Sequence, residues 1–171
     1  MAHFIGDNGT SALCDGKKIA KDNLIFEVLG DLDELTSFLG FAKNFIKLSG
    51  YKNWLTEIQK DIFVILSELA GAQKANWEKI IKKLDERLEF CQKNIPNLKN
   101  FIIPGASLAS ACLDYSRAVC RRAERSAIRL HKVRRIDPEM IVYLNHLSKF
   151  LFFFARLVNK KTKIKENIID N

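Results

Sequence analysis

The sequence predicts an all-α protein, in which one five-helix bundle follows an irregular N-terminal loop. Apolar residues recur at helical spacing over most of the 171 residues, as expected when one face of each helix packs against a core. Only 3 prolines and 8 glycines are present, too few for a protein built from many short strands and turns. A chain of this length is expected to form a single domain around one core.

The apolar content is not that of a membrane protein. Hydrophobic residues make up 47% and charged residues 28% of the sequence, which is typical of globular domains. The most apolar stretch, FLFFFARLV at residues 150–158, is much shorter than the ~18 residues that a membrane-spanning helix needs. The N-terminus shows neither a secretory signal pattern nor an Arg-rich presequence, and we therefore expect a cytoplasmic protein.

Cysteine spacing and net charge give two further expectations. Cys14, Cys91, Cys112 and Cys120 have no CxxC or metal-ligand spacing, so we expect free thiols in a reducing compartment. The formal net charge of +8 favours an anionic partner, such as a phosphate compound or a nucleic acid. Four lysines in residues 160–171 contribute part of this charge, and this basic tail is expected to be solvated and frayed.

Local patterns predict each element in turn. Residues 1–23 combine glycines with polar turn residues and predict a loop. A connector with two prolines, residues 94–107, separates the third and fourth helices. The fifth helix should begin with Asp137 as its N-cap and Pro138 in its first turn. From apolar spacing, helices are expected at residues 24–48, 53–70, 75–93, 107–131 and 137–159.

The fourth predicted helix has an unusual distribution of charge. Lysine is the commoner cation elsewhere, whereas RAVCRRAERSAIR, residues 117–129, contains five arginines. Arginine side chains form bidentate contacts with phosphates and carboxylates. The helix is therefore either a solvated face with internal ion pairs or a site for a polyphosphate. At 100° per residue, the charged side consists of Arg117, Arg121, Glu124 and Arg125, and the opposite side of Leu108, Cys112, Tyr115, Val119, Ala123 and Leu130.

The N-terminal loop could contribute to such a site. GDNGTSAL, residues 6–13, offers backbone N–H groups beside two glycines and the hydroxyls of Thr10 and Ser11. This combination can bind an anion, although a flexible surface terminus would have the same composition.

A cluster of carboxylates lies at the start of the first helical pattern. GDLDELTSFLG, residues 30–40, places Asp31, Asp33 and Glu34 directly before an apolar periodic stretch. Carboxylates are favourable in the first turn of a helix. They could also be half of a site whose cation comes from another part of the chain.

Four segments together resemble the PduO-type ATP:cob(I)alamin adenosyltransferases. FIIPGASLASACLDYSRAVCRRAER, residues 101–125, is similar to the family signature, with its aromatic-apolar-apolar-Pro-Gly entry and its Arg-x-x-Cys-Arg-Arg-Ala-Glu-Arg core. GDNGTSAL resembles the end of the family's phosphate loop, and FEVLGDLDELTSFLG resembles its Gly-x-x-Asp-Glu-Leu segment. YLNHLSKFLFFFARLVN, residues 143–159, resembles its last helix. The segments occur in the family's order and span nearly the whole chain.

The resemblance implies a fold and an activity. Members of the family are five-helix bundles that assemble into homotrimers with active sites between adjacent subunits. They transfer the 5′-deoxyadenosyl group of ATP, with Mg2+, to the cobalt of cob(I)alamin or a related corrinoid and release triphosphate. Such a protein must position ATP, stabilise the leaving triphosphate and hold the corrin without its lower nitrogen ligand. A reductase and a cobalamin-dependent acceptor enzyme are further partners that the resemblance suggests.

Matching residues give the expected site, although they do not identify the metal ligands. Phe101 matches the aromatic side chain below the cobalt. Asp33 and Arg117 match a carboxylate–arginine pair across the subunit interface on the corrin side. Asp31 and Glu34 then keep the interpretation of helix-start carboxylates. The positions that match ATP-binding residues are Gly6, Thr10, Ser11, Lys21, Arg121, Arg122, Glu124, Arg125 and Asn145.

The chain departs from the family pattern near the ATP end. His3, Phe4 and Ile5 stand where the family usually has Thr, a cation and Thr. Lys149 replaces a carboxylate of the last helix, and Asp114 stands where the family often has a neutral residue. These differences predict weaker ATP binding beside an intact corrin site.

Two other functions stay open at the level of sequence. A divergent, weakly active or inactive homologue could bind a corrinoid in order to deliver or sense it, which would fit the altered phosphate loop. A basic helical protein could bind nucleic acid through residues 117–129, but no recognised motif supports this and acidic residues interrupt the arginines. We therefore expect neither a nucleic acid nor a membrane as a partner.

Overall fold

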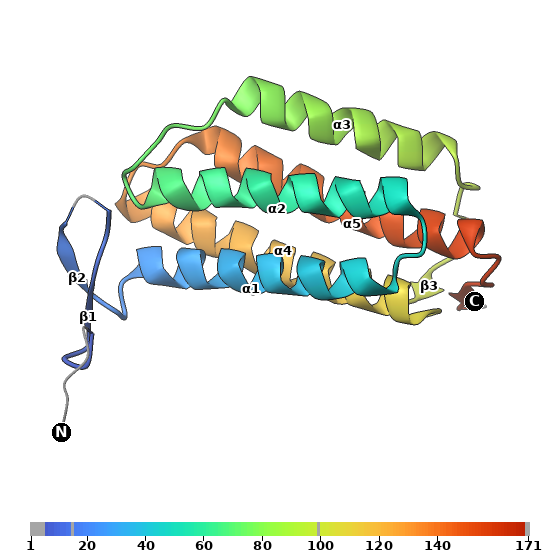
Figure 1. The fold of residues 1–171 in the computed structure, drawn as a ribbon, viewed down its shortest axis with the longest axis horizontal. Helices are drawn as coiled ribbons and strands as arrows, with labels where there is room; N and C mark the ends of the chain where they lie inside the picture. Colours follow the sequence, from blue (N-terminus) through green and yellow to red (C-terminus); the bar gives the residue numbers. More distant parts are fainter. Residues whose placement is uncertain (1–5, 15, 99, 170–171) are drawn as a thin grey trace.

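Five long helices account for most of the computed structural model, which describes residues 6–14, 16–98 and 100–169 (Figure 1). The predicted helices are all present, with ends that differ by a few residues. The second helix differs most at its start, because it begins at Ser49 rather than at residue 53. The helices are α1 Leu24–Phe45, α2 Ser49–Leu69, α3 Trp77–Lys93, α4 Leu108–Val133 and α5 Pro138–Lys161.

Side-chain caps determine where several helices begin. At the start of α4, Ser107 and Ser110 form a capping box that satisfies free backbone N–H groups. The Ser107 hydroxyl also donates to Asn159 Oδ1 (2.8 Å), which joins the start of α4 to the end of α5. Asp137 caps α5 and Pro138 follows it, as predicted. The entry to α4 is therefore fixed beside the last turns of α5.

The N-terminal segment contains a short hairpin where the sequence predicted only a loop. Strand β1 Thr10–Ala12 pairs antiparallel with β2 Lys18–Ala20. Gly16, at the turn between them, has φ +78°, a conformation that favours glycine. Strands of three residues are too short to show an alternating pattern, so the hairpin is not visible in the sequence. It lies beyond the start of α1, at one end of the bundle (Figure 1).

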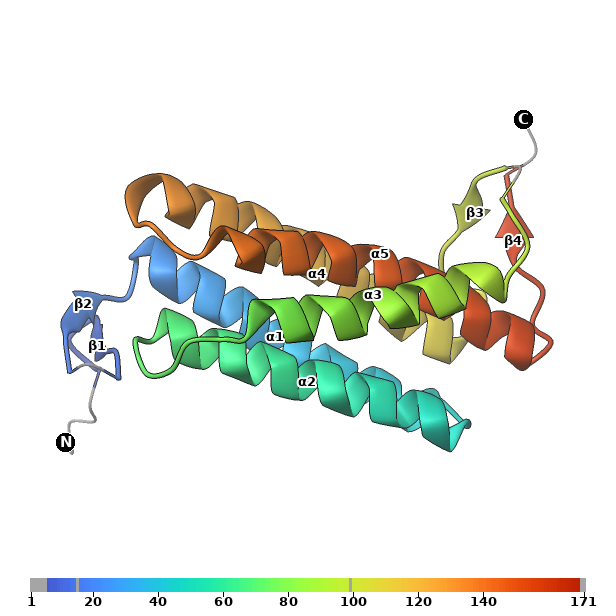
Figure 2. The same ribbon diagram turned by 90° about the horizontal axis from the view of Figure 1, so that it is seen from above.

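Helices α1, α4 and α5 form a continuous packed layer. α4 packs against both α1 and α5, while α2 packs on α1 and α3 packs on α5. Helices α1 and α4 are antiparallel, because Glu27 near the start of α1 pairs with Arg129 near the end of α4. Figures 1 and 2 show the resulting elongated bundle, with the hairpin at one end and β3 at the other.

Helix α5 supplies much of the core. Tyr143, Phe150 and Phe154 are fully buried, and the last two rings stack with their centroids 5.1 Å apart. By length and composition alone, α5 could cross a membrane. However, 61% of its apolar window is buried inside the bundle, as expected for the core helix of a globular protein.

The buried face of α4 differs from the predicted one. Leu108 and Tyr115 were expected in the core but are exposed. Small residues are buried instead, since α4 lies between two helices and approaches both closely. The buried residues of α4 are Ala109, Ser110, Leu113, Ser116, Val119, Cys120, Ala123, Ser126, Ala127 and Leu130. The exposed apolar residues of α4 therefore lie on its outer face, where the Tyr115 ring contacts Phe38 of α1 with the centroids 4.2 Å apart.

The segment after α5 is not a frayed tail over its described length. Strand β4 Asn167–Ile168 pairs antiparallel with β3 Ile102–Ile103. Figure 2 shows these two strands side by side at the end of the bundle away from the hairpin. The end of the chain is thus attached to the connector that precedes α4.

Candidate active site

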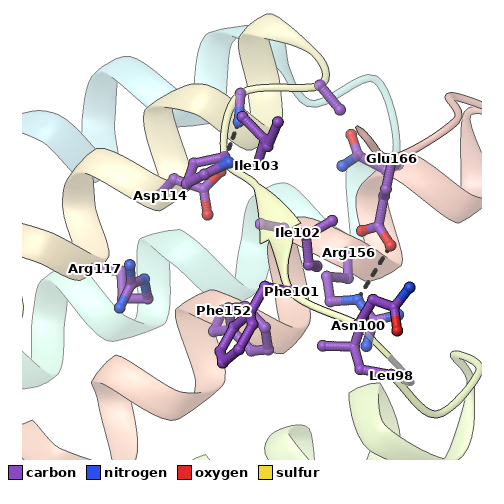
Figure 3. A pocket seen from close by; sticks show the side chains of 15 residues that line it. Leu98, Asn100, Phe101, Ile102, Ile103, Asp114, Arg117, Phe152, Arg156 and Glu166 are labelled. Atoms are coloured by element: carbon purple, nitrogen blue, oxygen red, sulfur yellow. Dashed lines mark hydrogen bonds and ion pairs between the residues drawn. The ribbon is translucent and has the colours of Figure 1, made fainter. Parts of the chain in front are cut away.

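A cavity of about 580 Å³ opens where the connector, α4, α5 and the C-terminal segment meet (Figure 3). The connector contributes Phe101 and Ile102, and α4 contributes Asp114 and Arg117. Its remaining walls include Phe152, Arg156 and Asn159 of α5, and Glu166. The cavity therefore combines aromatic surface with two arginines and two carboxylates.

Phe101 is an exposed aromatic side chain at this cavity. Its side chain is 77% exposed, although burying a phenylalanine would contribute favourably to folding. Phe152 of α5 lines the same cavity (Figure 3). A large aromatic ring held at a cavity but not packed in the core is available to contact a bound molecule.

Arg117 enters the same cavity from the first half of α4. Within the described residues, its buried Nε atom has no hydrogen-bond partner. An unpaired buried donor is unfavourable, so the site lacks an acceptor that a ligand or a second chain would supply. Asp33, the predicted partner, is exposed on α1 and has no hydrogen bond or ion pair within the described part of the chain. A single chain does not bring Asp33 and Arg117 together.

Asp114 is a carboxylate of the cavity that interacts with the charge of Arg117. Burial raises its pKa above the ordinary value, whereas a hydrogen bond from the Gly105 N–H (3.0 Å) and the charge of Arg117 lower it. The carboxylate of Glu166 raises the pKa of Asp114 further. Asp114 thus fixes the turn after β3 and influences the charge of the cavity.

The carboxylates Asp31 and Glu34 are not at a helix start, so the prediction for them was wrong. Helix α1 begins at Leu24, and these residues lie well inside it. Asp31 is buried and accepts hydrogen bonds from Arg122 Nε (2.8 Å) and Ser126 Oγ (2.7 Å). Arg122 also forms an ion pair with Glu34. These contacts join α1 to α4 and orient the Arg122 side chain.

The other arginines of α4 divide into two groups. Arg129 forms an ion pair with Glu27 of α1. Arg121 and Arg125 are exposed, one turn apart, and an Arg125 guanidinium N–H donates to the Arg121 carbonyl (3.1 Å). Together with Arg117 they form a row along the outer face of α4. Two of the five arginines are thus neutralised within the chain, which argues against an open cationic surface for nucleic acid.

Glu124 and Asn145 lie next to one another, although they are on different helices. The Asn145 side-chain amide donates to Glu124 Oε1 (3.0 Å). Each side chain is partly buried, so the pair has a defined position between α4 and α5. Lys149, one turn further along α5, is exposed. Two predicted ATP-binding residues are therefore brought together, and the changed residue Lys149 follows Asn145 by one turn.

The hairpin places Gly6, Thr10 and Lys21 close together. Gly6 has φ +99°, and a Cβ atom at this position would lie 2.9 Å from Lys21 Nζ and 3.4 Å from the Thr10 carbonyl oxygen. The Thr10 hydroxyl donates to Asn8 Oδ1 (2.7 Å). Glycine here permits an ammonium group to approach the backbone closely. The changed positions His3, Phe4 and Ile5 lie outside the described residues, and Ser11 is partly buried in β1.

The described residues contain no group of three or more His, Cys, Asp or Glu side chains that could hold a metal ion. The four cysteines are free thiols, in agreement with their spacing. Cys91 and Cys120 are buried in the core, and burial raises the pKa of Cys91 to about 12. These two thiols are therefore protonated and serve as packing residues.

Comparison with known proteins assigns this arrangement to a family. The sequence profile of the cobalamin adenosyltransferases matches residues 4–158. The chain belongs to the cobalamin adenosyltransferase family. It is 36% identical to a corrinoid adenosyltransferase of Citrobacter freundii, over 89% of this chain and 90% of that protein. It is 34% identical to the corrinoid adenosyltransferase of Bacillus subtilis, over 93% of this chain and 86% of that protein.

Solved structures of this family have the same fold as the adenosyltransferase chain. A variant of the PduO-type ATP:corrinoid adenosyltransferase from Lactobacillus reuteri, complexed with cobalamin and ATP, superposes with a TM-score of 0.92. That comparison covers 98% of this chain and 97% of the other, at 26% identity. A second variant of the same enzyme, complexed with ATP, also has a TM-score of 0.92, at 27% identity. The expected fold class is thus confirmed.

Several residues at the cavity of this adenosyltransferase were missed from its sequence. Arg156 and Glu166 form an ion pair (3.2 Å) in the cavity wall, and Phe152 lines the same cavity. The sequence contains one indication of this ion pair. Arg156 is a lone arginine within an apolar helix, and a buried arginine needs a partner. The identity of that partner depends on the fold of the C-terminal segment, which has no periodic pattern.

Proposed function

We propose that this protein transfers the 5′-deoxyadenosyl group of ATP to the cobalt of cob(I)alamin or a related corrinoid. Membership of the family supports this assignment, as do the relatives named corrinoid adenosyltransferases. The observation that carries it is the continuity of the site. An exposed Phe101 and an unsatisfied Arg117 mark one cavity, and the row of Arg121 and Arg125 leads away from it along α4.

The proposed reaction is a nucleophilic displacement. The electron pair of Co(I) attacks the ribose C5′ of ATP, a Co–C bond forms, and the bond from C5′ to the triphosphate oxygen breaks. Triphosphate leaves with the electrons of that bond, and the cobalt is formally oxidised to Co(III). The reaction needs no proton transfer, so the protein acts by positioning the substrates and by neutralising the leaving group.

Phe101, Arg117 and Asp33 serve the corrin side in this proposal. Phe101 occupies the position below the cobalt and excludes a lower nitrogen ligand. Arg117 pairs with Asp33 of a neighbouring subunit, which supplies the acceptor that its buried Nε lacks. The pair is a positioning device, since neither side chain reacts.

The remaining residues serve ATP. Arg121 and Arg125 neutralise the triphosphate as it leaves, and Lys21 and the N–H groups beside Gly6 contact phosphate oxygens. The joined Glu124 and Asn145 side chains orient the nucleotide. Arg122, Thr10 and Ser11 complete the ATP-binding set, with Arg122 oriented by its carboxylate partners. Mg2+ arrives bound to the triphosphate, because phosphate oxygens and water are its preferred ligands.

The proposed site needs more than one chain. The hairpin lies at the end of the bundle where α4 ends, and the cavity lies in the first half of α4, at Asp114 and Arg117, so roughly 25 Å of helix separates them. Triphosphate leaves from the carbon that cobalt attacks, hence its binding groups must lie next to the corrin. We therefore propose a homotrimer in which the hairpin of one subunit faces the cavity of the next. Exposed Phe41 and Tyr115 on the outer faces of α1 and α4 would be covered there.

Other parts of the proposal concern the cell. The free thiols fit a reducing cytoplasm, where a reductase would supply cob(I)alamin and a cobalamin-dependent enzyme would accept the product.

Substitution of the phosphate-loop positions by His3, Phe4 and Ile5 favours a second candidate function. In that case the protein binds and delivers or senses a corrinoid, with little or no transfer.

An anaerobic assay distinguishes the two functions. The protein is mixed with ATP, Mg2+ and chemically reduced cobalamin, and loss of cob(I)alamin is followed by absorbance. Adenosyl transfer predicts ATP-dependent loss together with one triphosphate per adenosylcobalamin formed. Corrinoid binding without any ATP-dependent loss would assign the delivery or sensing function instead.

A further inference from the structure

Arg156 is a buried cation within the apolar part of α5. Its neighbours in the sequence are mainly phenylalanines and leucines. The residue is only 5% exposed. A buried guanidinium is stable only when acceptors surround it. Its Nε donates to Glu166 Oε2 (3.2 Å), and its terminal nitrogen donates to the Pro96 carbonyl (3.1 Å). Arg156 therefore holds two segments that lie outside the bundle.

The chain reverses direction after α5 in a way that brings Glu166 back to Arg156. Lys163 has φ +59°, and its N–H bonds to the Lys160 carbonyl (3.2 Å). The Ile164 N–H bonds to the Asn159 carbonyl (2.9 Å). These two bonds around a left-handed residue form a Schellman ending. The turn is thus specific, and it directs the following residues toward the cavity.

Phe101 is attached to the same segment through its backbone. Strand β4 pairs with β3, with Ile102 opposite Ile168, and the Ile169 N–H bonds to the Phe101 carbonyl (2.9 Å). The Phe101 ring is 77% exposed, so core packing does not determine its position. Two further attachments of the connector also come from α5, namely Arg156 to Pro96 and Lys160 Nζ to the Asn94 carbonyl (2.8 Å).

We propose that residues 162–169 form a strap that holds Phe101 in place, with Arg156 and Glu166 as its positioning residues (Figure 3). This inference rests on the proposed function, because it concerns the side chain assigned to the position below the cobalt. Neither residue reacts or needs to touch the corrinoid. Their ion pair holds β4 in place, and β4 pairs with β3. The position of β3 in turn determines that of Phe101, the residue immediately before it.

The strap matters because the connector, residues 94–107, is otherwise attached to the bundle at few points. A side chain that must be ordered upon binding reduces affinity and rate, whereas a supported side chain already has the productive geometry. Loss of the strap should therefore affect the corrinoid and leave ATP binding intact. Within one chain, the ATP-binding set lies on the hairpin, further along α4 and on the first half of α5, away from the strap. The hairpin that faces this cavity in the proposed trimer belongs to the neighbouring subunit, and the strap does not hold it.

Three variants test the strap, one of them shortened and two with a single substitution. A chain that ends at Lys163 lacks Glu166 and β4, and Glu166→Gln keeps the shape of the side chain but removes its charge. Lys165→Gln is the matched control, since Lys165 is an exposed neighbour with no hydrogen bond or ion pair among the described residues. Light scattering and thermal unfolding verify that each variant is folded and has the assembly of the unmodified protein.

Two measurements separate positioning from a purely structural role. Hydrogen–deuterium exchange of residues 94–106 reports on the connector itself. The electron paramagnetic resonance spectrum of bound cob(II)alamin with ATP reports whether the lower nitrogen ligand has been displaced, since that nitrogen splits the cobalt lines. We expect the shortened chain and Glu166→Gln to exchange faster in the connector and to retain more of the nitrogen-bound species. Steady-state rates should show KM for the corrinoid raised about fivefold or more, with KM for ATP unchanged.

Each outcome decides the inference. Connector exchange in the shortened chain that matches the unmodified protein would overturn it, as would equal increases in both KM values. A loss in Lys165→Gln equal to that in Glu166→Gln would also overturn it, because charge near the cavity would then explain the effect. If the connector exchanges faster but the unmodified protein transfers no adenosyl group, the attachment stands and the proposed function fails.

Discussion

Asp31 and Asp33 are two positions apart on α1, and their surroundings are opposite. Asp31 is buried and bonded to Arg122 and Ser126, whereas Asp33 is exposed, with no partner among the described residues. Successive helical positions differ by about 100°, so two neighbouring carboxylates can serve different purposes. Asp31 holds the chain together, and Asp33 is available to another molecule.

Substitution of these two residues should separate stability from activity. Asp33→Asn should lower the rate of adenosyl transfer by about tenfold or more, equivalent to ~1.4 kcal/mol in the barrier, with unchanged thermal stability. Asp31→Asn should lower the free energy of unfolding by about 1–3 kcal/mol, because it leaves a guanidinium and a hydroxyl without their acceptor. Anaerobic rates and urea unfolding measure the two effects. Equal losses of activity at equal stability would refute the distinction.

Gly6 permits a second residue-scale test, at the ATP end. A Cβ at Gly6 would lie 2.9 Å from Lys21 Nζ, whereas a Cβ at Gly16 would meet no atom within 4 Å. Both residues have positive φ, so alanine strains the backbone at each. Gly6→Ala should raise KM for ATP, because it displaces the ammonium group, and Gly16→Ala should not. A similar rise in both variants would mean that backbone strain, not Lys21, accounts for the effect.

At the scale of elements, the sequence was informative wherever a periodic pattern was long. Five helices were predicted because each presents apolar residues at helical spacing over several turns. The hairpin and the β3–β4 pair were not predicted, because strands of two or three residues carry no pattern. The buried face of α4 was also missed, since small residues such as Ser116 and Ala127 are buried there by close contact with two helices. Composition alone indicated a possible anion site in residues 117–129 and 6–13, but the roles of individual site residues came only from the family motifs.

Asp61 gives a prediction for the packing of α2 against its neighbours. Burial raises the pKa of Asp61 to about 6, although the charges of Lys83 and Arg87 lower it. In the unfolded chain the pKa is about 3.9, so folding favours the protonated form. Between pH 4 and 6 the folded protein binds the extra proton, and its stability falls as pH rises through this range.

Asp61→Asn should remove that dependence. At pH 7.5 the variant should be more stable than the unmodified protein by up to about 3 kcal/mol, because a buried charge is replaced by a neutral group of similar shape. At pH 4 the two proteins should be equally stable, since Asp61 is then protonated in the folded state. Urea unfolding at both pH values measures the difference. A gain of the same size at pH 4 would show that the charge is not its cause.

At the scale of the whole molecule, the outer faces of α1 and α4 are where assembly is expected. Phe41 on α1 and Phe63 on α2 are both exposed, at 51% and 68%, but only Phe41 lies on the proposed interface. Phe41→Glu should convert the proposed trimer to smaller species in light scattering at micromolar concentration, because it introduces a charge that the interface would bury. Phe63→Glu is the matched control and should remain a trimer. If the unmodified protein is a monomer, the proposal of a site shared between subunits is wrong.

A shared site also predicts complementation between inactive chains. The proposed pair spans two chains, so a trimer made only of Asp33→Asn chains, or only of Arg117→Met chains, lacks the pair at every site. When trimers assemble at random from equal amounts of both chains, about one interface in four, averaged over all trimers, joins an intact Asp33 to an intact Arg117. Co-expression should therefore restore about a quarter of the activity. No recovery in trimers shown to be mixed would place both residues in the same chain's site.

The apolar character of α5 has a consequence for the protein in the cell. A helix whose composition would suit a membrane is harmless while most of its apolar surface is covered by the bundle. If the bundle opens, that surface becomes a target for chaperones, proteases and aggregation. Substitutions that weaken the core should thus reduce the amount of soluble enzyme before they reduce the rate per molecule. An organism carrying such a variant would lack coenzyme because little protein survives, even though every surviving active site is intact.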